Sequence, residues 1–182
     1  SSSRFTFGAV NDEIMGTSIK STSFTLVPYL DSVDLGKNTK IRQFHFSAVR
    51  DTLSTVYDNQ QRLLQNIYVS ELKKPLDSTV LYCGAFMNPK VREEYLDIEN
   101  RITVGIPVYD GGDSLSFDFS REFAESFVER LRTANVDSID LYINDLPGIY
   151  ITTDAPTGPG GRINMFNLNL QTNSYGYLTA NY

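Results

Sequence analysis

Residues Arg101–Phe119 have the sequence RITVGIPVYDGGDSLSFDF, which decides the expected class of fold. Apolar residues alternate with Thr, Gly and Pro in its first half, and with Ser and Asp in its second half. A period of two is typical of strands with one buried face. The stretch between the halves, Tyr109–Ser114, is typical of a tight turn because Gly tolerates the positive φ that such turns require. We therefore predict a β-hairpin here.

The segment that follows, Ser120–Ala134, predicts an amphipathic helix. Phe123, Phe127 and Leu131 recur at helical spacing and form an apolar stripe, while the charged residues fall off it. Ser120 suits the N-cap, because its hydroxyl can accept a hydrogen bond from a backbone N–H of the first turn. We expect one helix at about residues 120–134 that packs against an apolar layer.

Short strand patterns recur along the rest of the chain, separated by turns rich in Gly, Pro and Asn. They occupy Ser21–Leu30, Ile41–Leu53, Asn66–Leu72, Thr79–Phe86, Ser138–Ile143, Gly148–Thr153, Ile163–Leu170 and Tyr175–Tyr182. The charged stretch Asn88–Asn100 is ambiguous and could hold one or two helical turns. Many short strands and one amphipathic helix predict a mostly β fold, either a β-sandwich or a partly open barrel with that helix packed on it.

The strand Ile41–Leu53 separates its residues onto two faces. Phe44 and Phe46 fall on a mainly apolar face, and His45 falls on the opposite face, because successive side chains of a strand alternate. This is the only histidine of the chain, so any chemistry that needs an imidazole depends on that second face.

Length, charge and composition limit the domain organisation and the classes of partner that we expect for this chain. With 182 residues, 41% of them hydrophobic, we expect a single β-rich domain over residues 1–182, cut from a longer protein at one or both ends. A net charge of −6 without a basic cluster disfavours nucleic acid and anionic membrane surfaces as partners. The apolar runs are too short for a transmembrane helix.

Catalytic and cofactor motifs are few. Cys83 is the only cysteine, and its apolar surroundings favour a buried small hydrophobe. One Cys and one His nearly exclude a zinc site of the usual kind. A Ser-His-Asp triad would have to use His45, and no G-x-S-x-G elbow accompanies a serine. The phosphate- and dinucleotide-binding motifs are missing too, so we expect no cofactor, no metal and no catalytic residue.

Three aspartates near the turn of the predicted hairpin are the candidate ligand or cation site. These are Asp110, Asp113 and Asp118, and carboxylate oxygens are ligands that calcium prefers, although the spacing is not that of an EF-hand. A pair of carboxylates facing each other across a cleft would instead favour glycoside hydrolysis. The eleven Tyr and eleven Phe residues could provide a platform on which a sugar stacks.

Several segments resemble a family of Bacteroidetes exported lipoproteins, domain of unknown function 4270. The similar segments are GAVNDEIMG, through Gly8, Asn11, Asp12 and Gly16, then NIYVSELKKPLD, FVERLRTAN, LPGIYITTD and GRINMFNLN. The chain departs from the family in an extra DSIDLYIND stretch and in Cys83, where the family more often has Ser. The resemblance implies a lipid-anchored protein of the cell envelope, and it implies no activity.

We therefore expect a non-catalytic cell-envelope lipoprotein domain that binds a glycan or an envelope protein. Its contact with the membrane would be only through a lipid anchor outside this chain. Two alternatives stay open. One is a carboxylate-based polysaccharide hydrolase, and the other is an adhesion or assembly subunit, which would have an unpaired sheet edge that accepts a partner strand.

Overall fold

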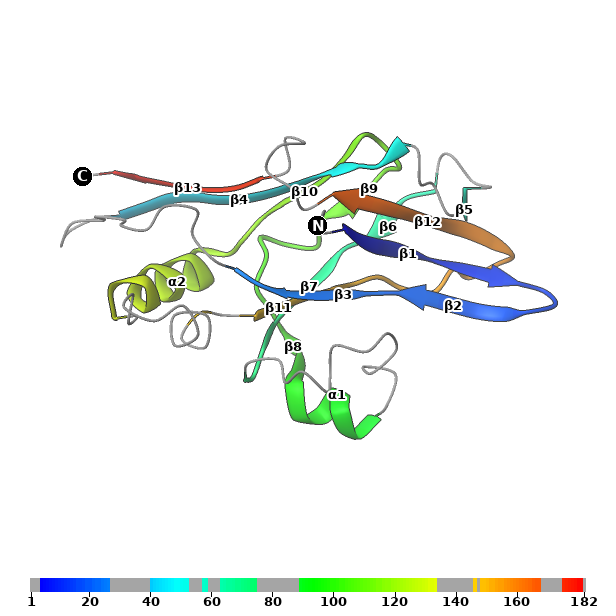
Figure 1. The fold of residues 1–182 in the computed structure, drawn as a ribbon, viewed down its shortest axis with the longest axis horizontal. Coiled ribbons are helices and arrows are strands. Elements are labelled where there is room, and N and C mark those ends of the chain that lie inside the picture. Colours follow the sequence, from blue (N-terminus) through cyan, green and yellow to red (C-terminus); the bar gives the residue numbers. More distant parts are fainter. Residues whose placement is uncertain are drawn as a thin grey trace.

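The structure is a computed structural model that describes residues 4–26, 40–52, 57–58, 63–74, 89–133, 146, 148–167 and 175–181. Most of these residues form antiparallel strands arranged in two packed layers, as Figure 1 shows. The mostly β fold with a packed amphipathic helix is confirmed. The predicted strands Thr79–Phe86, which contains Cys83, and Ser138–Ile143 lie outside the described residues.

The larger sheet contains seven of the described strands, all paired antiparallel. Its main path runs in the order β10 (Ser114–Asp118), β4 (Lys40–Arg50), β12 (Gly160–Asn167), β1 (Arg4–Asp12) and β2 (Gly16–Lys20), while β13 (Tyr175–Asn181) pairs with β4 and β5 (Tyr57–Asp58) pairs with β12. Strands β12 and β13 both lie on the side of β4 opposite β10, because β12 shares its β4 partner Val49 with β10, and β13 shares the partners His45–Ser47 with β10.

The second sheet packs against the first and contains four of the described strands. Their order is β3 (Thr22–Thr25), β11 (Gly148–Thr152), β7 (Tyr68–Leu72) and β8 (Leu96–Arg101), and a separate pair joins β6 (Gln65–Asn66) to β9 (Val108–Tyr109). The chain changes sheets at Ser21, between β2 and β3, where the Ser21 hydroxyl lies 2.6 Å from that of Thr152. This corner joins the two layers at one side of the sandwich.

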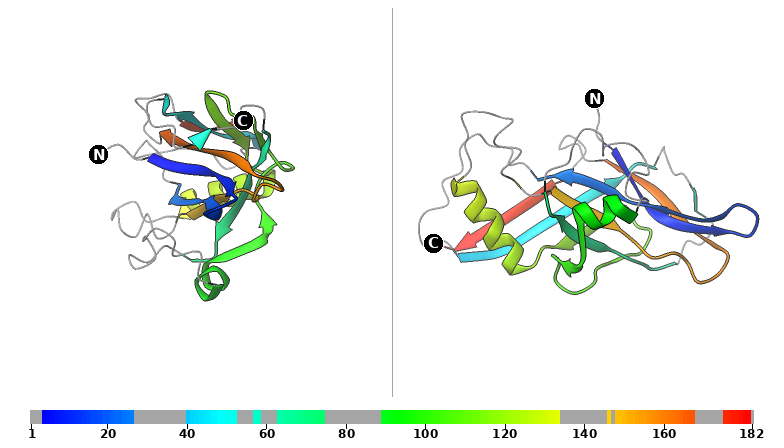
Figure 2. Two further views of the ribbon diagram at one scale, coloured as in Figure 1. Left: turned by 90° about the vertical axis from the view of Figure 1, so that its right-hand side faces the viewer. Right: turned by 90° about the horizontal axis from the view of Figure 1, so that it is seen from below.

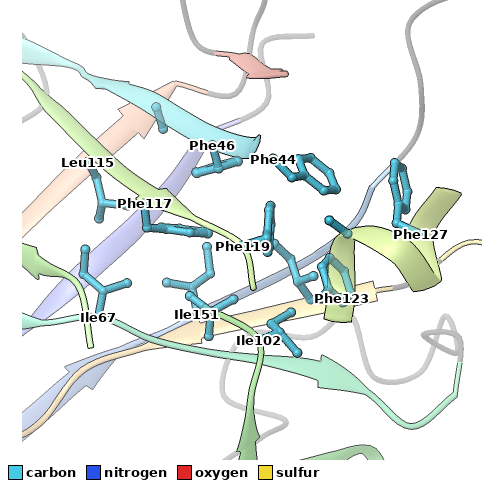
Figure 3. Close-up of a cluster of buried hydrophobic side chains, with 14 of the residues drawn as sticks. Phe44, Phe46, Ile67, Ile102, Leu115, Phe117, Phe119, Phe123, Phe127 and Ile151 are labelled. Carbon is cyan, nitrogen blue, oxygen red and sulfur yellow. The ribbon is translucent and has the colours of Figure 1, made fainter. Parts of the chain in front are cut away.

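The core lies between the two sheets and is rich in phenylalanine (Figure 3). Phe44 and Phe46 of β4 point into it, as their strand pattern predicts, and meet Ile151 of β11 and other buried residues from the second sheet. The ring centroids of Phe46 and Phe117 lie 5.0 Å apart. Burial of such rings against aliphatic residues of the second sheet, among them Val69, Ile149 and Ile151, is the main favourable contribution to this fold.

The predicted helix is confirmed as α2 (Arg121–Thr133), which packs across β4 at one end of the sandwich (Figure 2). The backbone N–H of Phe123 donates to the Ser120 hydroxyl at 3.2 Å, so Ser120 is the N-cap. Phe123 and Phe127 are buried, and their rings continue the aromatic core. The helix therefore covers that end of the hydrophobic core.

A second helix, α1 (Pro89–Tyr95), lies in the charged stretch that was ambiguous from sequence. It leads directly into β8, so the stretch forms about two helical turns and then a strand. Tyr95 packs with Leu72 and Tyr150 in a small cluster on the outer face of the second sheet. This helix therefore covers the face of that sheet turned away from the main core.

The predicted hairpin of residues 101–119 is wrong. Strand β9 pairs with β6, and strand β10 pairs with β4, so the two halves enter different sheets after a single bridge between Thr103 and Phe119. Of the alternating apolar residues in the first half, Ile102 is buried, whereas Val104, Ile106 and Val108 are 66%, 46% and 48% exposed. The turn itself is present, with Gly111 at φ 87°.

Candidate functional site

The three candidate aspartates have three different sets of partners. Asp110 accepts a hydrogen bond from the backbone N–H of Gly112 at 2.9 Å, so it stabilises its own turn. Asp113 forms an ion pair with Arg50 at 3.6 Å, and its side chain is 93% exposed. Asp118 lies five residues further along an extended segment, about 16 Å away at about 3.3 Å per residue. The turn and the strand thus spread the carboxylates apart.

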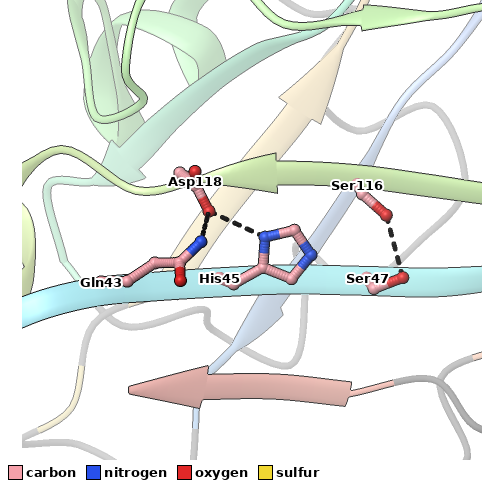
Figure 4. Close-up of polar contacts among 5 residues, drawn as sticks. All are labelled: Gln43, His45, Ser47, Ser116 and Asp118. Carbon is pink, nitrogen blue, oxygen red and sulfur yellow. Dashed lines mark hydrogen bonds and ion pairs between the residues drawn. The ribbon is translucent and has the colours of Figure 1, made fainter. Parts of the chain in front are cut away.

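Asp118 belongs to a polar row on the outer face of β4 and β10, which Figure 4 shows. The row consists of Gln43, His45, Ser47, Ser116 and Asp118. Asp118 Oδ1 accepts a hydrogen bond from Gln43 Nε2 at 3.0 Å and lies 2.7 Å from His45 Nδ1. Ser116 donates to the Ser47 hydroxyl at 2.9 Å. Antiparallel register creates the row, because it sets Asp118 opposite His45 and Ser116 opposite Ser47.

The row is accessible at its acidic end. The side chains of His45 and Asp118 are 21% and 42% exposed, respectively. Partial burial raises the pKa of Asp118, but the hydrogen bonds from Gln43 and His45 and the charge of His45 outweigh it and hold the pKa below its ordinary value. Asp118 is therefore ionised at neutral pH and presents a carboxylate to solvent.

Strand β13 continues this face on the other side of β4. Tyr175, Tyr177 and Thr179 stand opposite Ser47, His45 and Gln43, in that order. Directly opposite residues of an antiparallel pair share a sheet face. The register therefore sets two tyrosine positions beside the polar row.

The pair of His45 and Asp118 has the two supporting members of a catalytic triad. In a triad the serine hydroxyl gives its proton to the imidazole, and the carboxylate orients that imidazole. Here the two serines of the row, Ser47 and Ser116, instead bond to each other. The arrangement offers donors and acceptors for a ligand, and it contains no activated nucleophile among the described side chains.

A second polar cluster, which nothing in the sequence indicated, surrounds Arg162 of β12. This side chain is fully buried, and its Nη1 donates to the carbonyl oxygen of Leu63 at 2.9 Å and to Gln65 Oε1 at 3.3 Å. Gln65 in turn donates to the carbonyl oxygen of Arg162 at 2.9 Å. The guanidinium lies over the Tyr109 ring, 5.7 Å from its centroid. These contacts link β12 to β6 and to Tyr109 of β9.

Within the ranges described above, no group of three or more His, Cys, Asp and Glu side chains is placed to hold a metal ion. No described helix is long and apolar enough to span a bilayer. Comparison with known proteins finds no family model, no curated protein and no solved structure that matches the chain. The resemblance to an exported lipoprotein family therefore stays a prediction.

Proposed function

We propose that this chain is a non-catalytic binding module of the cell envelope whose ligand is a glycan. The proposed binding face is the polar row together with the adjoining positions of β13. The observation that carries the proposal is the contact of Asp118 Oδ1 with His45 Nδ1 at 2.7 Å, with the Tyr177 position of β13 opposite His45 on the other side of β4.

The chemistry of the row suits a sugar better than it suits a charged ligand. Carboxylate, amide, imidazole and hydroxyl groups alternate along it, and together they can donate to and accept from the vicinal hydroxyls of a saccharide. A tyrosine ring adds an apolar face and a polar tip, which match the two kinds of surface on a pyranose ring. The paired strands also present these groups in an extended row, which fits a polymer chain.

The envelope location and the lipid anchor outside this chain rest on the sequence resemblance alone. An exported module that holds a surface polysaccharide is consistent with that location. A protein ligand for the same face is an outcome of the test below, because a row of hydrogen-bonding groups can also serve a peptide.

The test is a glycan-array screen followed by calorimetric titration of any polysaccharide that binds. Asp118→Asn removes the carboxylate charge with little change in shape, and Asp113→Asn makes the same change at the exposed aspartate beside the turn. We expect Asp118→Asn to weaken binding about tenfold or more, the range for a charge-assisted hydrogen bond. Asp113→Asn should bind as the wild type does.

Three outcomes would contradict the proposal. The first is that no glycan binds, and the second is that Asp118→Asn binds as tightly as the wild type. The third is release of reducing sugar from a bound polysaccharide by the wild type but not by Asp118→Asn, which would favour the hydrolase alternative.

A further inference from the structure

We infer that Asp118 makes the proposed glycan site select against acidic sugars, so that its ligand is a polysaccharide without carboxylate or sulfate groups. This selectivity belongs to the same face of the sheet and therefore rests on the proposed function. Three features of the molecule support it: the bonding of the Asp118 carboxylate, the residue types of the polar row, and the net charge of the chain.

Both contacts of the Asp118 side chain fall on one of its two oxygens. Gln43 Nε2 at 3.0 Å and His45 Nδ1 at 2.7 Å lie against Oδ1, as the dashed lines in Figure 4 show. Among the described residues, none forms a hydrogen bond or an ion pair with Oδ2, and the side chain is 42% exposed. The Oδ2 atom is therefore the acceptor that this carboxylate offers to a ligand.

An ionised carboxylate accepts hydrogen bonds and donates none. A hydroxyl or an ammonium group of a sugar can donate to Oδ2, whereas the carboxylate of a uronic acid or a sulfate group is itself a negatively charged acceptor. Like charges brought together across an interface repel each other and so suppress the wrong partner. A sugar that contacts Oδ2 must therefore present a donor there.

The polar row and strand β13 contain no lysine or arginine that could neutralise an acidic sugar. Gln43, Ser47 and Ser116 are uncharged, and the sequence of β13 is YGYLTAN. Arginine is the residue best suited to bind a carboxylate, because its planar guanidinium matches the two oxygens. Arg50, at the end of β4, forms an ion pair with Asp113. An acidic sugar would thus meet a negative charge on the row and no permanently positive one.

The charge of the whole chain acts in the same direction. A net charge of −6 repels an approaching polyanion. At physiological ionic strength the Debye length is about 8 Å, so charges close to a bound glycan matter most. Asp113 is about 16 Å from Asp118 along the extended segment, whereas Asp118 lies within the row. Asp118 should therefore determine the selectivity, and Asp113 should not.

The test is binding to matched pairs of glycans that differ by an acidic group: oligogalacturonides and their methyl esters, sialylated lactose and lactose, and sulfated and unsulfated galactans. In every pair of which a member binds, the uncharged member should bind about tenfold or more tightly at neutral pH. Asp118→Asn should bring the two affinities closer, because it removes both the repulsion of the acidic member and the charge-assisted bond to the uncharged one. A merely structural role of Asp118 would weaken both members equally. Asp113→Asn is the matched control and should leave the ratio unchanged.

Titrations of the wild type at low and high salt keep the selectivity testable if Asp118→Asn does not fold. Higher salt should narrow the difference within each pair, because it screens the repulsion. An acidic member that binds as tightly as its uncharged counterpart would overturn the inference and leave glycan binding itself intact. A ratio that neither salt nor Asp118→Asn changes would do the same. If no glycan binds, on the array or in these pairs, the proposed function and this selectivity are both wrong.

Discussion

Gly111 lies directly against the guanidinium of Arg162. A Cβ built on Gly111 would come within 2.7 Å of Arg162 Cζ, and its φ of 87° disfavours any other residue. The turn that was predicted to join the two strands of a hairpin instead packs against the buried guanidinium of Arg162. The Tyr109 hydroxyl donates to the carbonyl oxygen of Gly112 at 2.7 Å and so stabilises this turn.

Replacing Gly111 by alanine should destabilise the fold substantially. Positive φ in a non-glycine residue costs about 1–3 kcal/mol, and displacing the guanidinium adds to that cost. Gly158→Ala is the control, because a Cβ on Gly158 would meet nothing within 4 Å. Urea denaturation of the two variants measures the difference. Equal midpoints would show that Arg162 does not constrain the turn.

At Gly8 the backbone of β1 lies close to that of β12. A Cβ on it would lie 2.0 Å from the carbonyl oxygen of Arg162, and φ is 139°. Gly8→Ala should therefore cost about 1–3 kcal/mol from backbone strain alone, with more from separation of the strands. Gly158→Ala, at an open position, should change the free energy of unfolding little. If both variants unfold at the same urea concentration, the pairing of β1 with β12 is not as close as described.

The N-cap of α2 can be tested by Ser120→Ala. Loss of the hydroxyl that bonds to the Phe123 N–H should reduce the free energy of unfolding by about 1 kcal/mol. Ser126→Ala lies inside the same helix and should be neutral or stabilising, because alanine has the highest helix propensity. Thermal unfolding followed by circular dichroism compares them. A cap variant as stable as the wild type would contradict this role.

The pair of Tyr68 and Asp154 should make stability fall at alkaline pH. The hydrogen bond from the Tyr68 hydroxyl to the Asp154 carboxylate, at 2.6 Å, raises the pKa of Tyr68 above its ordinary value of 10.0, and burial adds to this. A raised pKa means that the protonated phenol stabilises the fold below pH 10.0, and that this contribution disappears as pH rises through the folded-state pKa.

Tyr68→Phe should remove this part of the pH dependence while leaving the apolar ring in place. Urea midpoints measured on both sides of pH 10.0 should converge at high pH for the variant and the wild type. If the urea midpoints of Tyr68→Phe and the wild type change with pH in parallel, the hydrogen bond between Tyr68 and Asp154 contributes nothing to stability.

Features set by local spacing could be predicted from sequence. The stripe of Phe123, Phe127 and Leu131 identified α2, and alternation identified the buried face of β4, because a 3.6- or 2-residue period depends only on neighbours. Pairing partners could not be predicted in this way. Val108 follows a strand pattern, yet it pairs with Asn66 and leaves its side chain exposed, because partner choice depends on residues far away in the sequence.

The same limit applies to the candidate site. Asp118 was a candidate from sequence, and His45 was the only imidazole, but 73 positions separate them. Only the register of β10 on β4 brings them within hydrogen-bonding distance. The burial of Arg162 could not be predicted from sequence, because an arginine in a strand is usually on the solvent face.

If the polar row binds a glycan, the imidazole of His45 should report on that binding directly. As the only histidine, His45 gives one assignable pair of ring proton signals in an NMR spectrum. Titration with a glycan that the array identifies should shift these signals progressively to a plateau, and Asp118→Asn should shift the binding midpoint to higher glycan concentration. A glycan that binds tightly while the His45 signals stay unchanged would show that the polar row is not its binding site.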